Sequence, residues 1–215
     1  DLLRAPNRGP TGLRIPNVQA FTWESSGSTS IMNAGSLRVR KRLSMGFSGG
    51  ITYTLSKSMD DASSLGGGGG GVVAQNDLDL AAEWSRSSGD QRHRVSVDFA
   101  YELPFGANRK WLAGDGLLNQ ILGDWIVNGT ISYNSGSPFT ARITGASSDL
   151  SRGTNGTLRA DYNGQAIGLS DPTIAMFFNT TAFSVPAAGT FGNSSRNLIT
   201  GPTSTTVNMS MSKSM

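Results

Sequence analysis

Long stretches of this chain alternate apolar and polar residues with a period of two. The clearest stretch runs from His93 to Phe105, and its polar or small positions include Ser96 and Asp98. Its apolar positions are Val95, Val97, Phe99, Tyr101, Leu103 and Phe105. Successive side chains of a β-strand point to opposite faces, so the pattern predicts a strand with one apolar face and one polar face.

The length of this stretch indicates the kind of sheet to which it belongs. Strands of soluble sandwiches usually hold about five or six residues, whereas a tilted strand that crosses a membrane needs roughly 9 to 11. The stretch from His93 to Phe105 has the length of a membrane-crossing strand. It therefore favours the wall of an outer-membrane type of β-barrel over a soluble sandwich.

Four further stretches, within 36–45, 47–56, 125–134 and 207–215, repeat the alternation. A tight turn near Ser44–Gly46 predicts that the first two form a hairpin. The sequence therefore predicts an all-β fold, an antiparallel meander of about five to six long amphipathic strands of the outer-membrane-barrel type. The residues predicted to share its apolar face, for assembly or membrane contact, are Leu37, Val39, Phe47, Ile51, Tyr53, Leu55, Val95, Val97, Phe99, Tyr101, Leu103, Trp125, Val127, Ile131, Tyr133, Val207, Met209 and Met211.

Two long segments, roughly 59–92 and 144–201, lack the alternation and predict loops. The first contains the six consecutive glycines Gly66–Gly71, and the second is rich in Gly, Ser, Asn and Thr. A short apolar group within Leu117–Leu122 predicts one or two helical turns between the third and fourth strong strands.

The N-terminal residues 1–16 contain three prolines and predict an extended arm, followed by one β-barrel-type domain over 17–215. We expect no ladder strand of the arm within its own domain. We expect a neighbouring subunit to cover the apolar residues of the arm, which are Leu2, Leu3, Leu13 and Ile15. Because the chain begins at Asp1 without an initiator methionine, we expect a mature or excised piece of a longer protein.

The amino-acid composition excludes several kinds of catalytic site. The 215 residues include no cysteine and one histidine, His93, so no thiol site, histidine-based triad or multi-histidine metal centre can form within one chain. Gly66–Gly71 lack the Lys-Ser or Lys-Thr that follows a phosphate-binding loop. We therefore expect no enzyme, no cofactor and no metal centre. Calcium binding stays open for a group of loop aspartates whose spacing matches no known calcium motif, namely Asp60, Asp61, Asp77, Asp79 and Asp90.

Charge and aromatic residues each allow two interpretations. The net charge of +3 is mild and gives no reason to expect a nucleic-acid partner. Arg38, Arg40 and Arg42 share one strand face, where they either attract anions to a channel or, more economically, pair with acidic residues of a neighbouring strand, Asp98 and Glu102. Aromatic residues near the strand ends suit membrane-interface girdles, although a protein core uses such residues equally well.

Six short motifs follow one another along the chain: YTLSKSMDD (53–61), DQRHRV (90–95), YELPFG (101–106), GDWIVNG (123–129), SGSPF (135–139) and GNSSRN (192–197). This ordered set resembles the C-terminal barrel segment of TonB-dependent outer-membrane receptors, over about Pro16 to Met215. The resemblance implies a barrel of roughly 22 strands with a plug in its lumen, driven by an inner-membrane coupling complex to import a solute. Two departures are the lack of a plug and the closing Met215, where the family usually has an aromatic residue. We expect that this chain alone is not an importer.

Five or six strands fall short of the eight or so that close the smallest filled barrels, so both sheet edges need partners. Two hypotheses supply them. The favoured one is a structural subunit whose edges pair with other copies of itself, giving a fibre or tube. The alternative is the C-terminal wall of an outer-membrane transporter, with the lipid bilayer and the remaining strands of the barrel as partners. Both predict the outer membrane or the extracellular surface of a double-membraned bacterium.

Overall fold

The computed structural model of the protein describes residues 2–4, 6–9, 12–19, 21–61, 73–106, 109–111, 116–143 and 158–213. The chain divides into two compact units, each assembled from segments that are far apart in the sequence. The sheet unit comprises residues 34–56, 91–136 and 202–215, and the loop unit comprises residues 1–33, 57–90 and 137–201.

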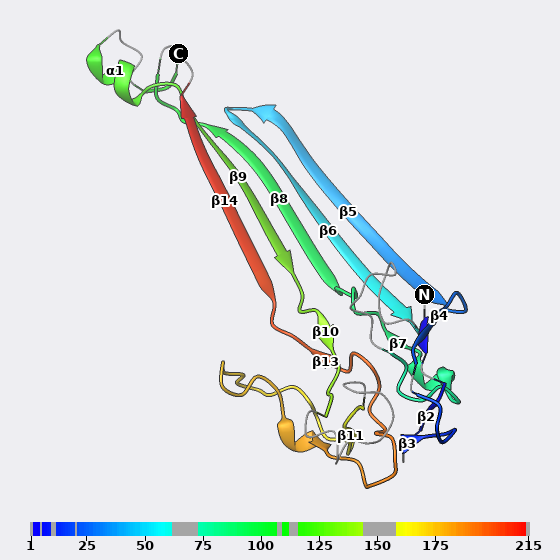
Figure 1. Cartoon of the computed structure of the whole chain (residues 1–215). Coiled ribbons are helices and arrows are strands. Elements are labelled where there is room, and N and C mark those ends of the chain that lie inside the picture. The colour runs from blue at the N-terminus through cyan, green and yellow to red at the C-terminus, as the bar shows by residue number, and fades with distance from the viewer. Residues whose placement is uncertain are drawn as a thin grey trace. The chain divides into compact units, whose positions relative to one another are not determined.

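Five long antiparallel strands form the main sheet (Figure 1). They are β5 (Ser30–Ser44), β6 (Phe47–Asp60), β8 (His93–Glu102), β9 (Trp125–Asn134) and β14 (Ser204–Lys213). Their order across the sheet is β14-β9-β8-β6-β5, so each long strand pairs with the long strands that precede and follow it along the chain, although β7 lies between β6 and β8 in sequence and β10 to β13 lie between β9 and β14. This confirms the predicted all-β meander. The first residues of β5 and the last residues of β6 belong to the loop unit.

The turn between β5 and β6 confirms the predicted hairpin. Met45 and Gly46 have φ angles of 53° and 76°. Two consecutive central residues with positive φ are typical of a type I′ turn, whose twist matches that of the flanking strands. Gly46 adopts this conformation without strain, whereas Met45 does so with a Cβ that the left-handed region disfavours.

The connection from β8 to β9 contains α1 (Leu117–Leu122), which confirms the predicted short helix. The predicted strand to Phe105 was too long, because β8 ends at Glu102. Pro104 has no backbone N–H to donate to a ladder, and the chain turns there. Leu103 still donates from its backbone N–H to the carbonyl of Trp125, at 2.8 Å.

Apart from the ends of β5 and β6, the described part of the loop unit contains short elements. Its strands are β1 (Leu2–Arg4), β2 (Arg8–Gly9), β3 (Gly12–Leu13), β4 (Trp23–Ser25), β7 (Ser85–Arg86), β10 (Pro138–Phe139), β11 (Asp161–Tyr162), β12 (Phe183–Ser184) and β13 (Ile199–Thr200), and its 3₁₀ helices are η1 (Leu80–Glu83) and η2 (Thr180–Ala182). The antiparallel pairs are β1 with β4, β2 with β3, β10 with β13, and β11 with β12, while β7 pairs with the end of β6. The predicted loops thus contain short paired segments. Gly66–Gly71 lie outside the described residues.

The N-terminal arm was predicted to form no ladder strand, and this was wrong. Leu2 of β1 pairs with Ser25 of β4 and is 3% exposed, so its own unit covers it. The prolines of the arm lie between the short strands and leave the ladder N–H groups of β1, β2 and β3 intact. Leu13 and Ile15 remain exposed, and the side chain of Leu3 lies outside the described part.

The hydrophobic core is confined to one unit. The buried apolar residues of the described chain all belong to the loop unit, and they are Leu2, Ala74, Leu158, Ala160, Ala182 and Ile199. Gly192 lies so close to the Arg159 carbonyl that a Cβ at this position would clash with it. The long strands of the sheet unit therefore bury no large apolar side chain among the described residues.

Candidate functional site

The ladder register aligns the apolar positions of four strands in rows across one face of the sheet unit. Ile51, Val97, Ile131 and Val207 are successive Cα partners on β6, β8, β9 and β14. The rows on either side are Phe47–Tyr101–Val127–Met211, Gly49–Phe99–Gly129–Met209 and Tyr53–Val95–Tyr133–Thr205. A register slip of one residue would move a whole strand's set to the other face, so this alignment specifies a continuous apolar surface.

The edge strand β5 contributes to the same two faces. Ser36 Oγ and Thr54 Oγ1 lie 2.9 Å apart, which puts Ser36 on the polar face with Thr54. The ammonium of Lys41 lies 5.4 Å from the centre of the Phe47 ring, on the apolar face. Alternation between these two contacts places Leu37 and Val39 on the apolar face, as the sequence predicts. Of the predicted apolar set, Leu103 lies beyond its strand, and the role of the whole set stays a prediction.

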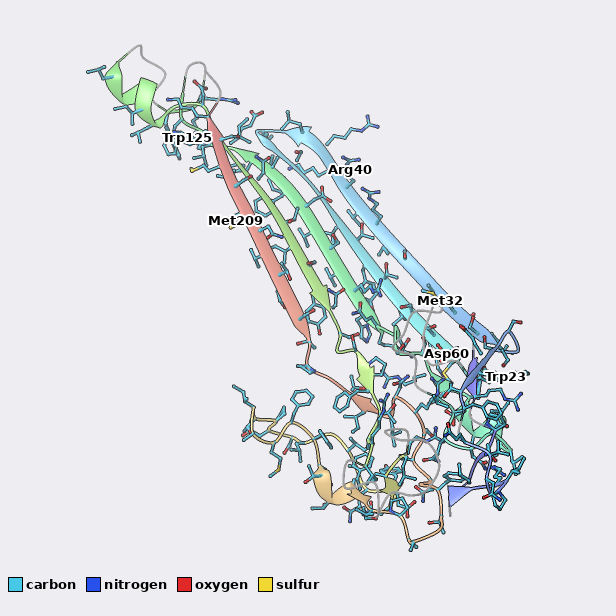
Figure 2. All side chains as sticks on the ribbon, in the orientation of Figure 1. Trp23, Met32, Arg40, Asp60, Trp125 and Met209 are labelled. Atoms are coloured by element: carbon cyan, nitrogen blue, oxygen red, sulfur yellow. The ribbon has the colours of Figure 1, made fainter. Side chains whose placement is uncertain are left out.

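This apolar face is open. Ile51 is 51% exposed, Val207 56% and Met209 65%. Scattered exposed apolar residues are ordinary, but a contiguous apolar surface of this kind marks contact with a membrane or with another protein. Figure 2 labels Met209 on β14 and Trp125 at the start of β9.

Aromatic residues bound the apolar face at both ends of β9, where Trp125 and Tyr133 share the apolar side. They stand about 27 Å apart along an ordinary strand, or roughly 20 Å along the membrane normal at the tilt of barrel strands. This is close to the roughly 25 Å apolar band of outer-membrane barrels. At the Tyr133 end, the hydroxyl of Tyr53 lies 2.9 Å from His93 Nδ1, and the two rings stack. His93 begins β8, as expected for a strand-end residue.

The opposite face is polar and hollowed. Its central rows are Gly50–Asp98–Thr130–Asn208 and Thr52–Ser96–Ser132–Thr206. A cleft of about 760 Å³ lies over this region, and its lining includes Arg40, Arg42, Asp98, Asn128, Thr130 and Asn208. Gly50 leaves room for the carboxylate of Asp98, which a Cβ at that position would meet at 2.9 Å. The polar face therefore combines cationic, anionic and neutral hydrogen-bonding groups.

The predicted cross-strand pairing of the arginines is not seen. Within the described residues, no ion pair joins Arg38, Arg40 or Arg42 to Asp98 or Glu102; Glu102 instead pairs with Arg109, at 2.7 Å. The β8–β9 connection brings Arg109 beside the end of β8, a proximity that strand pairing alone does not suggest. The interpretation of the arginines as anion-attracting groups stays a prediction.

A buried ionic network holds the loop unit together, and sequence reasoning missed it. Arg196 donates to the carboxylate of Asp60 at 2.7 Å and to the backbone carbonyl of Glu83 at 2.8 Å. Arg159 donates to both carboxylate oxygens of Glu83 at 2.9 Å. Gln75 joins the same group, because its backbone N–H donates to Glu83 and its side-chain oxygen accepts from the Arg159 N–H. Two of the motifs contain members of this network, YTLSKSMDD with Asp60 and GNSSRN with Arg196, but neither motif indicates that they pair.

The loop aspartates have separate partners. Asp60 accepts from Arg196, Asp77 from Arg4, Asp90 from Arg86, Asp61 from the Thr29 N–H, and Asp79 caps η1. The hydrogen bond to Asp77 raises the pKa of the Arg4 guanidinium above its usual value. Among the residues that the structure describes, no group of three or more His, Cys, Asp or Glu is placed to hold a metal ion. The same residues contain no helix long and apolar enough to cross a membrane.

Residues 3–215 match the family described as "Outer membrane beta barrel domain". No curated protein and no solved structure matches the chain.

Proposed function

This chain belongs to the outer membrane beta barrel domain family, and from that membership we propose that its sheet unit is one wall of a transporter barrel in the outer membrane. The apolar face contacts lipid, and the polar face with its cleft lines the interior. The observation that carries the proposal is the register that joins Ile51, Val97, Ile131 and Val207 into one row and repeats this row by row. A lipid-exposed barrel wall requires this separation of faces.

The two edges of the main sheet need further strands as partners. Within the described chain, β5 pairs only with β6 along the main sheet, and β14 pairs only with β9. In lipid each backbone polar group needs a partner, so strands of a barrel leave no open edge. We assign the missing partners to further strands of the same polypeptide, in line with the resemblance to the C-terminal segment of TonB-dependent receptors.

The connections between strands define the orientation of this wall. The Met45–Gly46 turn and the connection 103–124 join strands at one end of the sheet, whereas the longer connections 61–92 and 135–203 join them at the other. Outer-membrane barrels have short turns on the periplasmic side and longer loops outside. The connections 61–92 and 135–203 are therefore assigned to the extracellular side, where an imported solute first meets the protein.

Self-assembly is the second candidate, and the exposed edge strand favours it. β5 has 15 residues and is exposed along its whole length. If the edges of separate copies pair, a contact that does not close propagates into a tube or fibre. In that case the apolar face packs against other copies instead of lipid.

Val97→Asp, with Ser96→Asp as its matched control, tests the membrane wall. The two residues are neighbours on β8 and differ in the face they occupy, because Val97 pairs with Ile51 and Ser96 pairs with Thr52. A charge on the lipid face is costly, whereas one on the polar face is solvated. We expect Val97→Asp to abolish insertion into outer-membrane vesicles and Ser96→Asp to retain it. Equal insertion of both variants would contradict the proposal.

The intact mass of the native protein separates the two candidates. A transporter wall requires a polypeptide several times the mass of this chain and one complete barrel. A self-assembling subunit requires a chain of this mass in long assemblies. Each outcome excludes the other.

A further inference from the structure

The β8–β9 connection presents exposed apolar side chains, which we call the α1 platform and define as Trp111, Leu117, Ile121 and Leu122. Leu117 is 77% exposed, Ile121 64% and Trp111 50%. Leu117 and Ile121 are four residues apart on α1, so they project from the same side of the helix. No side chain in the described part of the sheet unit covers them.

Backbone hydrogen bonds hold Trp111 against the segment that follows β8. The Trp111 N–H donates to the Pro104 carbonyl at 3.0 Å, and the Gly106 N–H donates to the Trp111 carbonyl at 3.1 Å. The Trp111 ring packs against Phe105, with 5.4 Å between the ring centres. These contacts give the Trp111 ring a fixed place beside Phe105.

Trp125 joins the platform to the apolar face of the sheet. Its indole Nε1–H donates to the carbonyl of Ile121 at 2.9 Å, so the end of α1 is held beside the first residue of β9. Trp125 shares a face with Val127 and Ile131, which carry the apolar rows. The end of α1 therefore lies next to a residue of the face assigned to lipid.

Cationic side chains accompany the platform. The ammonium of Lys110 lies 5.3 Å from the centre of the Trp111 ring, and Lys213 is the Cα partner of Trp125. Tryptophan and lysine together at the end of an apolar band suit the headgroup region, where an indole is half-solvated and an ammonium meets lipid phosphates.

We propose that the α1 platform docks on the membrane surface, at the boundary between the headgroups and the acyl chains. This inference rests on the proposed barrel wall. Docked in this way, α1 lies in the plane of the periplasmic interface and covers its apolar side chains with lipid, as short amphipathic anchors do. The anchor fixes the depth at which the wall sits in the bilayer.

Site-directed fluorescence tests the docking in the full chain. Because the sequence has no cysteine, Leu117→Cys offers a single site for an environment-sensitive label. The protein is folded into vesicles of phosphatidylcholine and phosphatidylglycerol that carry a nitroxide quencher either near the headgroup or deep in the acyl chains. We expect the label at position 117 to lose more fluorescence to the shallow quencher than to the deep one.

Leu78→Cys is the matched control, because Leu78 is 76% exposed and lies in the loop unit. Its label should be quenched by neither lipid. If positions 117 and 78 behave alike, the label itself seeks the membrane and the docking is wrong.

A label at Val97→Cys separates this inference from the barrel wall. Deep quenching at position 97 without shallow quenching at position 117 keeps the wall and overturns the docking. Shallow quenching at 117 without deep quenching at 97 supports docking and overturns the wall. If neither position is quenched, both proposals fail, and a protein partner or a second copy covers the platform.

Discussion

The ring of Phe99 lies directly over Gly129. The two residues are Cα partners between β8 and β9, and a Cβ at Gly129 would lie 2.4 Å from the Cε1 and Cζ atoms of the ring. The aromatic side chain fills the space that the glycine leaves on the apolar face, a packing that compensates for glycine in a strand. The glycine is therefore required by its cross-strand neighbour.

Gly129→Ala is expected to displace the Phe99 ring and to destabilise the sheet by about 1–3 kcal/mol, the usual cost of overpacking. The measurement is the free energy of unfolding in urea, on protein folded into vesicles. Gly35→Ala is the control, since nothing lies within 4 Å of a Cβ at Gly35. An alanine at position 35 should be neutral or slightly stabilising, because it removes freedom from the unfolded chain. Similar losses at both positions would refute the packing argument.

Arg196→Ala leaves the carboxylates of Asp60 and Glu83 buried without their shared partner. Removing one member of a buried ionic group typically costs about 3–5 kcal/mol. We expect the loop unit to unfold at lower urea concentration, measured by protease sensitivity between residues 137 and 201. Arg109→Ala provides the comparison, because its pair with Glu102 is part-exposed and worth about 0–1 kcal/mol. If Arg109→Ala destabilises the protein as much as Arg196→Ala, burial does not explain the stabilising effect of the network.

Met45→Asn is expected to stabilise the hairpin. Met45 has a φ of 53° and is 96% exposed, so its side chain contributes little packing and carries the strain of the left-handed region. Asparagine tolerates this region, and Asn-Gly is the preferred pair of a type I′ turn. The gain should be about 0.5 kcal/mol, read from the urea midpoint at constant slope. A loss of stability would show that Met45 makes a contact in the membrane that the isolated chain lacks.

Deletion of residues 1–16 is expected to affect the loop unit and to leave the sheet unit intact. It removes β1 from β4, removes the buried side chain of Leu2 and breaks the pair of Arg4 with Asp77, so the loop unit should lose stability. The strands that carry the apolar rows are untouched, and insertion into vesicles should persist. If the chain is instead a self-assembling subunit, the truncated protein should still fold and no longer form long assemblies. Electron microscopy and vesicle flotation distinguish these outcomes.

The strands were predictable because their information is local. The alternation within His93–Glu102 and Trp125–Asn134 indicates which residues share a face, because successive side chains of a β-strand point to opposite faces. The Met45–Gly46 turn was found for the same reason. The end of β8 was misplaced because alternation continues through Leu103 and Phe105, although Pro104 between them cannot donate to a ladder.

The loop unit escaped prediction because its stability depends on contacts between distant residues. Nothing near Glu83 in the sequence indicates that Arg159 and Arg196 will surround it, and each of these residues alone resembles an ordinary surface charge. The strand β1 was not predicted because proline disfavours ladder pairing. The prolines of the arm lie outside the paired residues of β1. Patterns of period two carry no information about such pairings.

The position of Arg196 has a consequence for the order of folding. Its partners Asp60 and Glu83 precede it by 136 and 113 residues, so the ionic network cannot close until the segment that contains Arg196 has been synthesised. Closing contacts over such separations is slow, because the loop entropy is lost before the contact repays it. Until then Asp60 and Glu83 lack the buried partners that they have in the folded loop unit. If the chain is exported as proposed, late closure of the network leaves the loop unit without a compact shape during its passage through a narrow channel.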